Sequence, residues 1–152
     1  TADGIIVIDR NFQNNGEKTI DVKVSNNKLS MNTIFWPGIV ANGKDILVHS
    51  NKVEGEGYVG ISSFWGDGIK IIGNNVQNFT PIELPEYGLG APIMLNPDTR
   101  NCFVVGGSNQ TNVVDLGTDN IITGVNVMHG NPPGPAIRDA MRDWNPVFPP
   151  GL

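Results

Sequence analysis

The sequence predicts an all-β fold in which the chain winds as a parallel β-helix of about five to six coils. Three observations support this prediction. A short apolar motif recurs along the chain, and its apolar positions alternate with period two, which is typical of strands. The 152 residues also include 19 Gly and 11 Pro, which favour turns. We therefore expect many short strands joined by turns, with little helix.

Each copy of the motif is a triplet with apolar ends, followed after two further residues by an asparagine or a glycine. The triplets begin at Ile6, Val22, Ile46, Ile69, Cys102 and Ile121, and the turn positions are Asn11, Asn27, Asn51, Asn74, Gly107 and Asn126. Asn tolerates left-handed backbone angles and Gly tolerates them better, so these positions are expected to form one column of corners. Stacked asparagine amides can hydrogen-bond from coil to coil. The spacing between copies varies, which predicts loops of different length on a constant coil.

The remaining strands are placed from shorter apolar segments. Strands are expected after the corners around Leu29, Val53, Val76 and Val113-Val114, and further strands at 38–40, 59–61 and 92–95. Three strands per coil is the plan of a parallel β-helix. The Pro-, Glu- and Gly-rich segment 80–90 is expected to project from it as a loop.

The end of the chain has a different pattern. Residues 1–130 are expected to form the coils and 131–152 a C-terminal cap with a Pro-rich tail. Within the cap, Ile137, Met141 and Trp144 fall at helical spacing after Pro135, which predicts a helix over 135–144. This helix would cover the apolar end and the strand edges of the last coil. The first coil has no comparable cap, which predicts missing N-terminal coils or a partner chain there.

The repeat resembles that of the right-handed parallel β-helix proteins of the pectin-lyase-like superfamily. The shared pattern is Gly-Ile followed by Ile-x-Ile-x-x-Asn-x-Val, found in general form at Gly38-Ile39 with 46–53 and at Gly60-Ile61 with 69–76. The resemblance covers roughly residues 5–128 and implies the C-terminal portion of such a protein, secreted or at a cell surface. It indicates the fold and leaves the function open.

Members of that superfamily include polysaccharide lyases, glycoside hydrolases, epimerases, phage tailspikes and surface proteins without known activity. The resemblance implies that an enzyme of this type would bind sugars along the outer groove of one sheet. The paired Asp and Gly-His-Gly set of polygalacturonases is not found, nor is the Arg and calcium-binding Asp set of pectate lyases. No catalytic residue is therefore assigned, and we expect a module that is not an enzyme.

The charge of the chain bears on its partners. Its net charge of −5 argues against nucleic acid, because phosphate binding needs an excess of Lys and Arg. Apolar runs are shorter than the ~18 residues needed to span a bilayer, so no membrane insertion is expected. A polysaccharide or other glycan is the expected partner.

Six residues are candidates for contact with a sugar: Trp36, Trp65, Glu86, Tyr87, Asp98 and Arg100. Aromatic side chains stack on sugar rings, and a carboxylate with an Arg beside a groove would bind or deprotonate a uronic acid. The alternatives stay open. The aromatic side chains would then cover the coils beneath a loop, and the charged side chains would form a solvated surface pair.

Several residues have both a structural and a functional interpretation. The positions Asp21, Asp45, Asp67, Asn101 and Asn120 precede successive strands and would stack into an acidic ladder able to hold Ca²⁺. Ordinary turn chemistry is the alternative that we favour, and no other metal or cofactor is expected. Asn78 and Asn109 begin the acceptor pattern for N-glycosylation. Cys102 is expected to be a small buried side chain, and His49 and His129 to be structural or exposed.

Three functions remain after these observations. The leading one is a module that binds carbohydrate or supports assembly at a cell surface. The second is a lyase or hydrolase acting on an acidic polysaccharide, with a groove partly built from missing N-terminal coils. The third is a structural spacer. An enzyme should show clustered charged residues on one sheet face, a binding module exposed aromatics, and a spacer neither.

Overall fold

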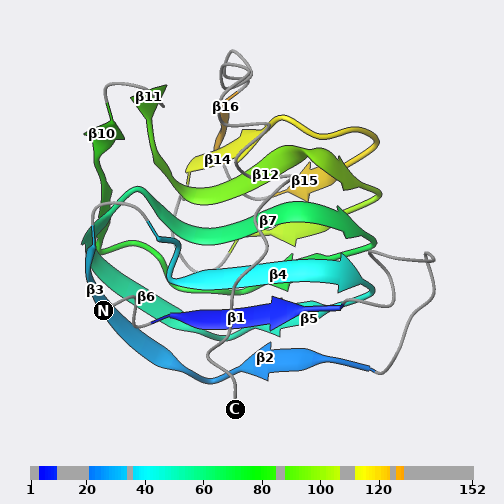
Figure 1. Ribbon diagram of the computed structural model, residues 1–152, viewed down its shortest axis with the longest axis horizontal. Coiled ribbons are helices and arrows are strands. Elements are labelled where there is room, and N and C mark those ends of the chain that lie inside the picture. The colour runs from blue at the N-terminus through cyan, green and yellow to red at the C-terminus, as the bar shows by residue number, and fades with distance from the viewer. Residues whose placement is uncertain are drawn as a thin grey trace, which may run out of the picture.

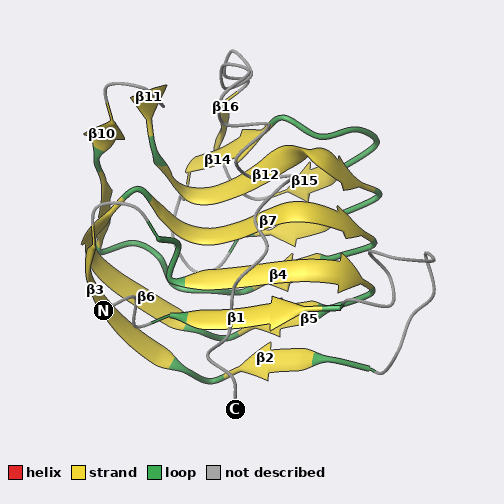
Figure 2. Ribbon diagram, in the orientation of Figure 1, coloured by secondary structure: helices red, strands yellow, loops and turns green. Residues whose placement is uncertain are grey.

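The computed structural model describes residues 4–9, 21–33, 36–84, 88–106, 112–123 and 126–128. These residues form strands and turns, and none of them is helical (Figure 2). Their strands build three parallel sheets and one small antiparallel hairpin. The all-β prediction and the parallel pairing of the strands are therefore confirmed. The predicted helix over 135–144 and the cap over 131–152 lie outside the described residues.

The three parallel sheets surround one core (Figure 1). Sheet A consists of β1 (Ile5–Ile8), β4 (Ile39–Lys44), β7 (Val59–Asp67), β12 (Ala91–Arg100), β14 (Asn112–Asp115) and β16 (Asn126–Met128), in that order. Sheet B consists of β2 (Lys23–Ser25), β5 (Leu47–His49), β8 (Lys70–Ile72), β13 (Phe103–Val105) and β15 (Ile121–Thr123). Sheet C consists of β3 (Lys28–Thr33), β6 (Lys52–Gly57) and β9 (Phe79–Pro81). From β1 to β9 the chain passes from sheet A to B to C and returns one strand further along each, as in a β-solenoid; beyond the hairpin the described strands alternate between sheets A and B.

The core is made of aliphatic columns that run across the sheets. In sheet B the parallel register aligns Val24, Val48, Ile71 and Val104, and the last three are completely buried. In sheet A, Ile39, Ile61 and Ile93 are aligned in the same way. A fully buried aliphatic side chain contributes roughly 1.5–3 kcal/mol relative to an exposed one. The apolar ends of the sequence triplets therefore supply most of the attraction between successive coils.

Three of the predicted corner asparagines form a ladder between sheets B and C. The Nδ2 of Asn27 donates to Oδ1 of Asn51, and Nδ2 of Asn51 donates to Oδ1 of Asn74, both at 3.0 Å. The same Oδ1 atoms also accept the backbone N–H groups of Asn27 and Asn51. We call Asn27, Asn51 and Asn74 the asparagine ladder. Its side-chain stacking is confirmed.

The expected backbone conformation of the ladder was wrong by one residue. The left-handed residue precedes each ladder asparagine, at Asn26 (φ 58°), Ser50 (φ 55°) and Gly73 (φ 59°). These three residues are exposed. The exposed residue therefore turns the chain, while the following asparagine keeps an ordinary backbone and directs its amide along the axis. The turn is made by the backbone of the first residue, and the contact between coils is made by the side chain of the second.

Several strands belong to a different sheet than expected. The triplet Ile6-Val7-Ile8 lies in β1 and pairs with β4 in sheet A, and Val113-Val114 lies in β14 of the same sheet. Asn126 is in β16 opposite Asn112, so it is not a corner. Asn11 and Gly107 lie outside the described residues. These errors share one cause, because an alternating apolar triplet looks the same in any strand and does not identify its partner.

The last motif copy is also shifted by one residue. Phe103 pairs with Ile121 and Val104 with Ile122. The residue aligned with Cys102 on the neighbouring coil is therefore Asn120, not Ile121. The Oδ1 of Asn120 accepts the backbone N–H of Cys102 at 2.8 Å. As a result Ile122 packs against the core, whereas Ile121 is 59% exposed. Consecutive isoleucines fit a period of two in either register, which explains the error.

Substitution of these two isoleucines tests the register. We expect Ile122→Ala to lower the free energy of unfolding by about 2 kcal/mol, because it removes apolar volume that packs on the core. Ile121→Ala, the matched control, should change it by less than about 0.5 kcal/mol. Urea denaturation measures both values. The reverse order would show that Ile121 is the inward residue.

The segment expected to project is a short hairpin. β10 (Glu83–Leu84) and β11 (Gly88–Leu89) pair antiparallel between β9 and β12. They extend beyond the sheets at the upper left of Figure 1. The remaining residues of this segment, 85–87, lie outside the described part of the chain. The projection agrees with the sequence expectation.

Candidate functional site

Three of the sugar-contact candidates meet on sheet A. Asp98 in β12 is the direct neighbour of Trp65 in β7, and Arg100 is the neighbour of Asp67. Alternate residues of a strand point to the same face, so Trp65, Asp98 and Arg100 share one face. Asp98 and Arg100 are exposed and Trp65 is half-buried. We call Trp65, Asp98 and Arg100 the Trp65 cluster.

A neighbouring carboxylate fixes the position of the Arg100 side chain. The Nε of Arg100 donates to Oδ2 of Asp67 at 3.1 Å, and Nδ2 of Asn101 donates to Oδ1 of the same carboxylate at 2.8 Å. An exposed ion pair of this kind contributes at most about 1 kcal/mol to stability. The main effect of this ion pair is geometric, because the hydrogen bond from Nε orients the Arg100 guanidinium. The cluster thus presents an aromatic ring, a carboxylate and a guanidinium on adjacent rigid strands.

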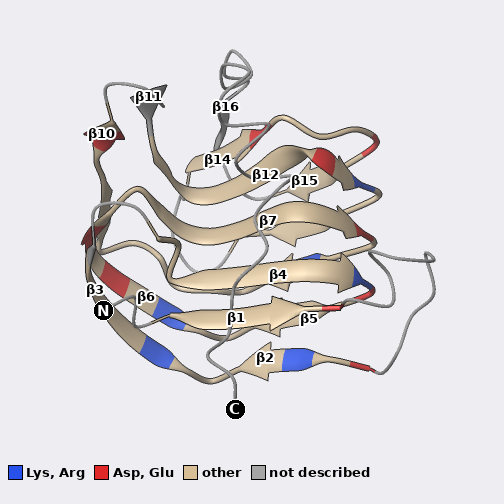
Figure 3. Cartoon of the chain, viewed as in Figure 1, with Lys and Arg blue, Asp and Glu red and all other residues tan. Residues whose placement is uncertain are grey.

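The positions that were considered as an acidic ladder do not lie in one column. Lys44, Asp67 and Arg100 align at the carboxyl ends of β4, β7 and β12, so basic and acidic positions alternate there (Figure 3). Asp45 and Asn101 each follow a member of this column by one residue, and both make turns there with positive φ of 55° and 52°. The favoured alternative, turn chemistry, is therefore confirmed at these two positions. The part of the chain that the structure describes contains no group of three or more His, Cys, Asp or Glu side chains that could hold a metal ion.

The remaining predicted residues are not part of the cluster. Trp36 is half-buried just before the start of β4, whereas Trp65 lies near the end of the neighbouring strand β7. Glu86 and Tyr87 lie outside the described residues, as do Asn109 and His129. Asn78 is exposed in a turn, so its glycosylation stays a prediction.

The middle of sheet A is closed to ligands. Val40, Ser62 and Met94 are in register and alternate with the core residues, yet all three are at most 4% exposed. Asn96 is buried beside them, and its Nδ2 donates to Oγ of Ser62 at 3.1 Å. Residues 38–41, 59–63 and 92–96 therefore do not provide an open groove for a sugar.

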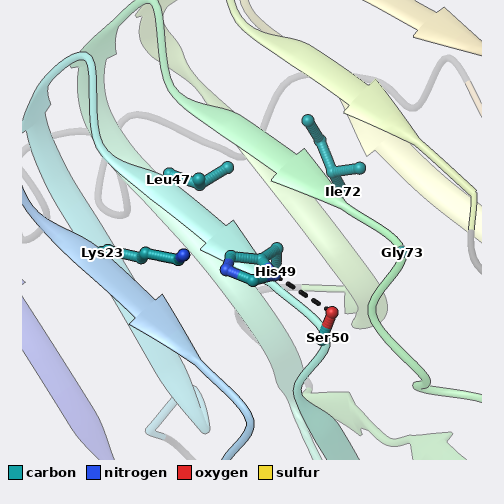
Figure 4. Close-up of a pocket in the computed structure, with 6 residues that line it drawn as sticks. All are labelled: Lys23, Leu47, His49, Ser50, Ile72 and Gly73. Atoms are coloured by element: carbon teal, nitrogen blue, oxygen red, sulfur yellow. Dashed lines mark hydrogen bonds between the residues drawn. The ribbon is translucent and has the colours of Figure 1, made fainter.

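A groove on the outer face of sheet B was not predicted from the sequence. The middle residues of four triplets point outward there and align as Lys23, Leu47, Lys70 and Phe103, and the shifted last copy places Ile121 next in this row. Two adjoining hollows of about 510 and about 320 Å³ share Lys23 and Leu47. The larger is also lined by Asp21, Val22, Asp45 and Lys70, and the smaller by His49, Ser50, Ile72 and Gly73 (Figure 4). We call these two hollows the sheet B groove.

His49 has one ring nitrogen bonded and one without a partner. Its Nδ1 is 3.0 Å from Oγ of Ser50 (Figure 4). Its Nε2 is buried and has no hydrogen-bond partner.

The sequence signal that would have found this groove is the middle position of each triplet. In a strand with buried ends, that position faces the opposite side of the sheet.

Cys102 behaves as expected for a small buried side chain. It is 1% exposed, and burial raises the pKa of its thiol to about 11. A thiol with this pKa is protonated at neutral pH and is a poor nucleophile. Cys102 therefore contributes to packing.

Charged residues on sheet C are paired with one another. Glu54 lies between Lys28, at 3.4 Å, and Lys52, whose hydrogen bond is the main cause that lowers the pKa of the Glu54 carboxyl. Lys28 and Lys52 are direct neighbours in the register, and Glu54 is aligned with Ser30. This face has the composition of a solvated surface and adds no candidate site.

Comparison with other proteins gives no further indication of function. Among the described residues there is no helix long and apolar enough to cross a membrane. Neither a protein-family model, nor a curated protein, nor a solved structure matches this chain.

Proposed function

We propose that this chain is a right-handed parallel β-helix of the pectin-lyase-like type, with about five to six coils, that binds carbohydrate at a cell surface or outside the cell. The three parallel sheets and the asparagine ladder support the fold. The single observation that carries the function is the register between β7 and β12, which makes Trp65 and Asp98 direct neighbours.

The Trp65 cluster suits a sugar ring chemically. The indole face provides apolar contact area for the C–H groups of the ring. The carboxylate of Asp98 would accept hydrogen bonds from sugar hydroxyls, and the guanidinium of Arg100 would donate to hydroxyl or carboxylate oxygens. The bond from Arg100 Nε to Asp67 holds the guanidinium in place, so little freedom of this side chain is lost on binding.

Substitution of Trp65 tests this proposal. We expect wild-type protein to bind at least one member of a panel of neutral and acidic polysaccharides, measured by titration calorimetry or affinity electrophoresis. Trp65→Ala should weaken that binding about tenfold, equivalent to about 1.4 kcal/mol. The matched control is Trp36→Ala, which removes a half-buried indole just before the start of β4. This variant should change binding less than about twofold.

Two outcomes would contradict the proposal. The first is no binding by the wild-type protein across the panel. The second is an equal loss of affinity in both tryptophan variants, which would indicate a general structural effect.

A lyase acting on an acidic polysaccharide is the second candidate. The exposed Asp98 and Arg100, at alternate positions on one face of β12, favour it, because uronic acid cleavage needs a group that removes a proton and a cation beside the carboxylate. Incubation with uronic acid polysaccharides should then release unsaturated products that absorb in the ultraviolet. The absence of such products across the panel would exclude this candidate.

A further inference from the structure

We infer that the sheet B groove is a second binding site, separate from the Trp65 cluster, for a sugar that carries a carboxylate or sulfate group. The oxyanion would lie between the side chains of Lys23 and His49. The apolar face of the ring would rest on Leu47 and Ile72. This inference does not depend on carbohydrate binding at sheet A, because the two sites lie on different sheets.

The basic groups of the groove are arranged around one strand. Lys23 in β2 and Lys70 in β8 occupy the same register on either side of Leu47 in β5. Neighbouring strands are about 4.8 Å apart, so the two lysine Cα atoms are within about 10 Å of each other. Both lysines are exposed. Both lysines line the larger hollow, and Lys23 also lines the smaller one beside His49.

His49 provides the feature that points to a ligand. Its Nε2 is buried and has no hydrogen-bond partner, while Nδ1 lies 3.0 Å from Oγ of Ser50. When the Ser50 hydroxyl donates to Nδ1, the imidazole carries its hydrogen on Nε2 and needs an acceptor there. Figure 4 shows the Lys23 side chain extending toward the His49 ring. A rotation of the exposed Lys23 side chain would open Nε2 to the groove, and an oxyanion would then accept from both groups. Charge-assisted hydrogen bonds are stronger than neutral ones.

The apolar floor of the groove indicates that the ligand is more than an ion. Leu47 and Ile72 line it and are half-buried. The same face continues along sheet B to Phe103 and Ile121, which are 36% and 59% exposed. A sugar ring has an apolar face of C–H groups that suits such a surface. A longer chain of sugars would extend across the strands toward Phe103.

The acidic residues of the groove determine where the anion would lie. Asp21 and Asp45 line only the larger hollow, at the start of the strands. His49 is four residues after Asp45, a separation of roughly 13 Å along an extended strand. The smaller hollow has no acidic side chain in its lining. An oxyanion is therefore favoured at the His49 end, where Lys23 lines the hollow and no carboxylate does.

Titration calorimetry with a defined set of probes tests this inference. The probes are an oligosaccharide of uronic acid residues, a sulfated oligosaccharide, the carboxyl-reduced neutral form of the first, and sodium acetate and sodium sulfate alone. To remove the contribution of sheet A, every titration is performed in the Trp65→Ala background. We expect at least one charged oligosaccharide to bind tenfold or more tightly than the neutral form, with an affinity that falls as salt is added.

Variants then assign the site. We expect Lys23→Gln to weaken binding of the charged oligosaccharide about tenfold and His49→Gln about fivefold, since each removes one contact to the oxyanion. The control Lys28→Gln removes the same charge from sheet C and should change affinity less than about twofold. Lys23 is exposed, so its substitution leaves the core intact even if His49→Gln affects folding.

Three results would overturn the inference. One is equal affinity for the charged and neutral oligosaccharides, and another is an equal effect of Lys23→Gln and Lys28→Gln. The third is acetate or sulfate alone binding as tightly as the oligosaccharides, which would make this a site for free anions. Loss of binding at the Trp65 cluster does not affect any of these comparisons, so the two proposals fail independently.

Discussion

Replacement of Asn51 by alanine is expected to lower the free energy of unfolding by about 3 kcal/mol, because it leaves several buried polar groups without partners. Asn51 is 1% exposed and is the middle member of the asparagine ladder. Its Oδ1 accepts from the backbone and side chain of Asn27, and its Nδ2 donates to Asn74 and to the carbonyl of Val24. The loss should appear as a decrease in Tm of about 6–12 °C in a chain of this size.

Asn78→Ala is the matched control for this experiment. Asn78 is exposed in a turn, so its substitution also removes a side-chain amide but leaves no buried polar group without a hydrogen-bond partner. We expect a change within about 0.5 kcal/mol. If Asn51→Ala costs less than about 1 kcal/mol, the ladder does not stabilise the stack as we describe, and solvent or backbone adjustment replaces its bonds.

Replacement of Gly55 by alanine is expected to cost at least about 3 kcal/mol, because backbone strain and a backbone clash act together. Gly55 has a φ of +105° and is aligned with Met31 on the neighbouring strand. A Cβ at this position would lie 2.1 Å from the carbonyl oxygen of Met31. Because the obstacle is backbone, relief would require β3 and β6 to separate. Thermal or urea denaturation measures the loss.

Gly73→Ala is the control that separates the two effects expected in Gly55→Ala, the strain of a left-handed backbone and the steric clash of the new Cβ. Gly73 also has a positive φ, of +59°, but a Cβ there would meet nothing within 4 Å. The equivalent positions before the other ladder asparagines hold Asn26 and Ser50, so side chains are accommodated at this corner. We expect a cost of about 1 kcal/mol from the left-handed backbone alone. Equal costs for Gly55→Ala and Gly73→Ala would contradict the assigned role of the Met31 carbonyl.

The sequence was informative where a feature depends on residues close together in the chain. The alternation in Ile46-Leu47-Val48 predicted a strand with buried ends, and Asn51 after it predicted a stacked amide. Both predictions are confirmed. The acidic ladder failed because Asp45 and Asp67 are adjacent to strand starts in sequence, yet the register places them in different columns. A shift of one residue along a strand is invisible in composition and decides which side chains meet.

The sites illustrate the same distinction. Trp65 and Asp98 were both candidates, but their contact depends on the pairing of β7 with β12. The sheet B groove gathers Lys23, His49 and Ile72 from three strands, and no local motif joins these residues.

Local sequence patterns are sufficient to predict short strands, asparagine corners and an apolar interior. These properties follow from side-chain alternation and turn preference over a few residues. The assembled fold was needed to identify which strands are neighbours, which residue of each corner turns the chain, and which outward side chains form a surface. The physical reason is that parallel pairing joins segments separated by a whole coil, so its register is set by the packing of the assembled stack.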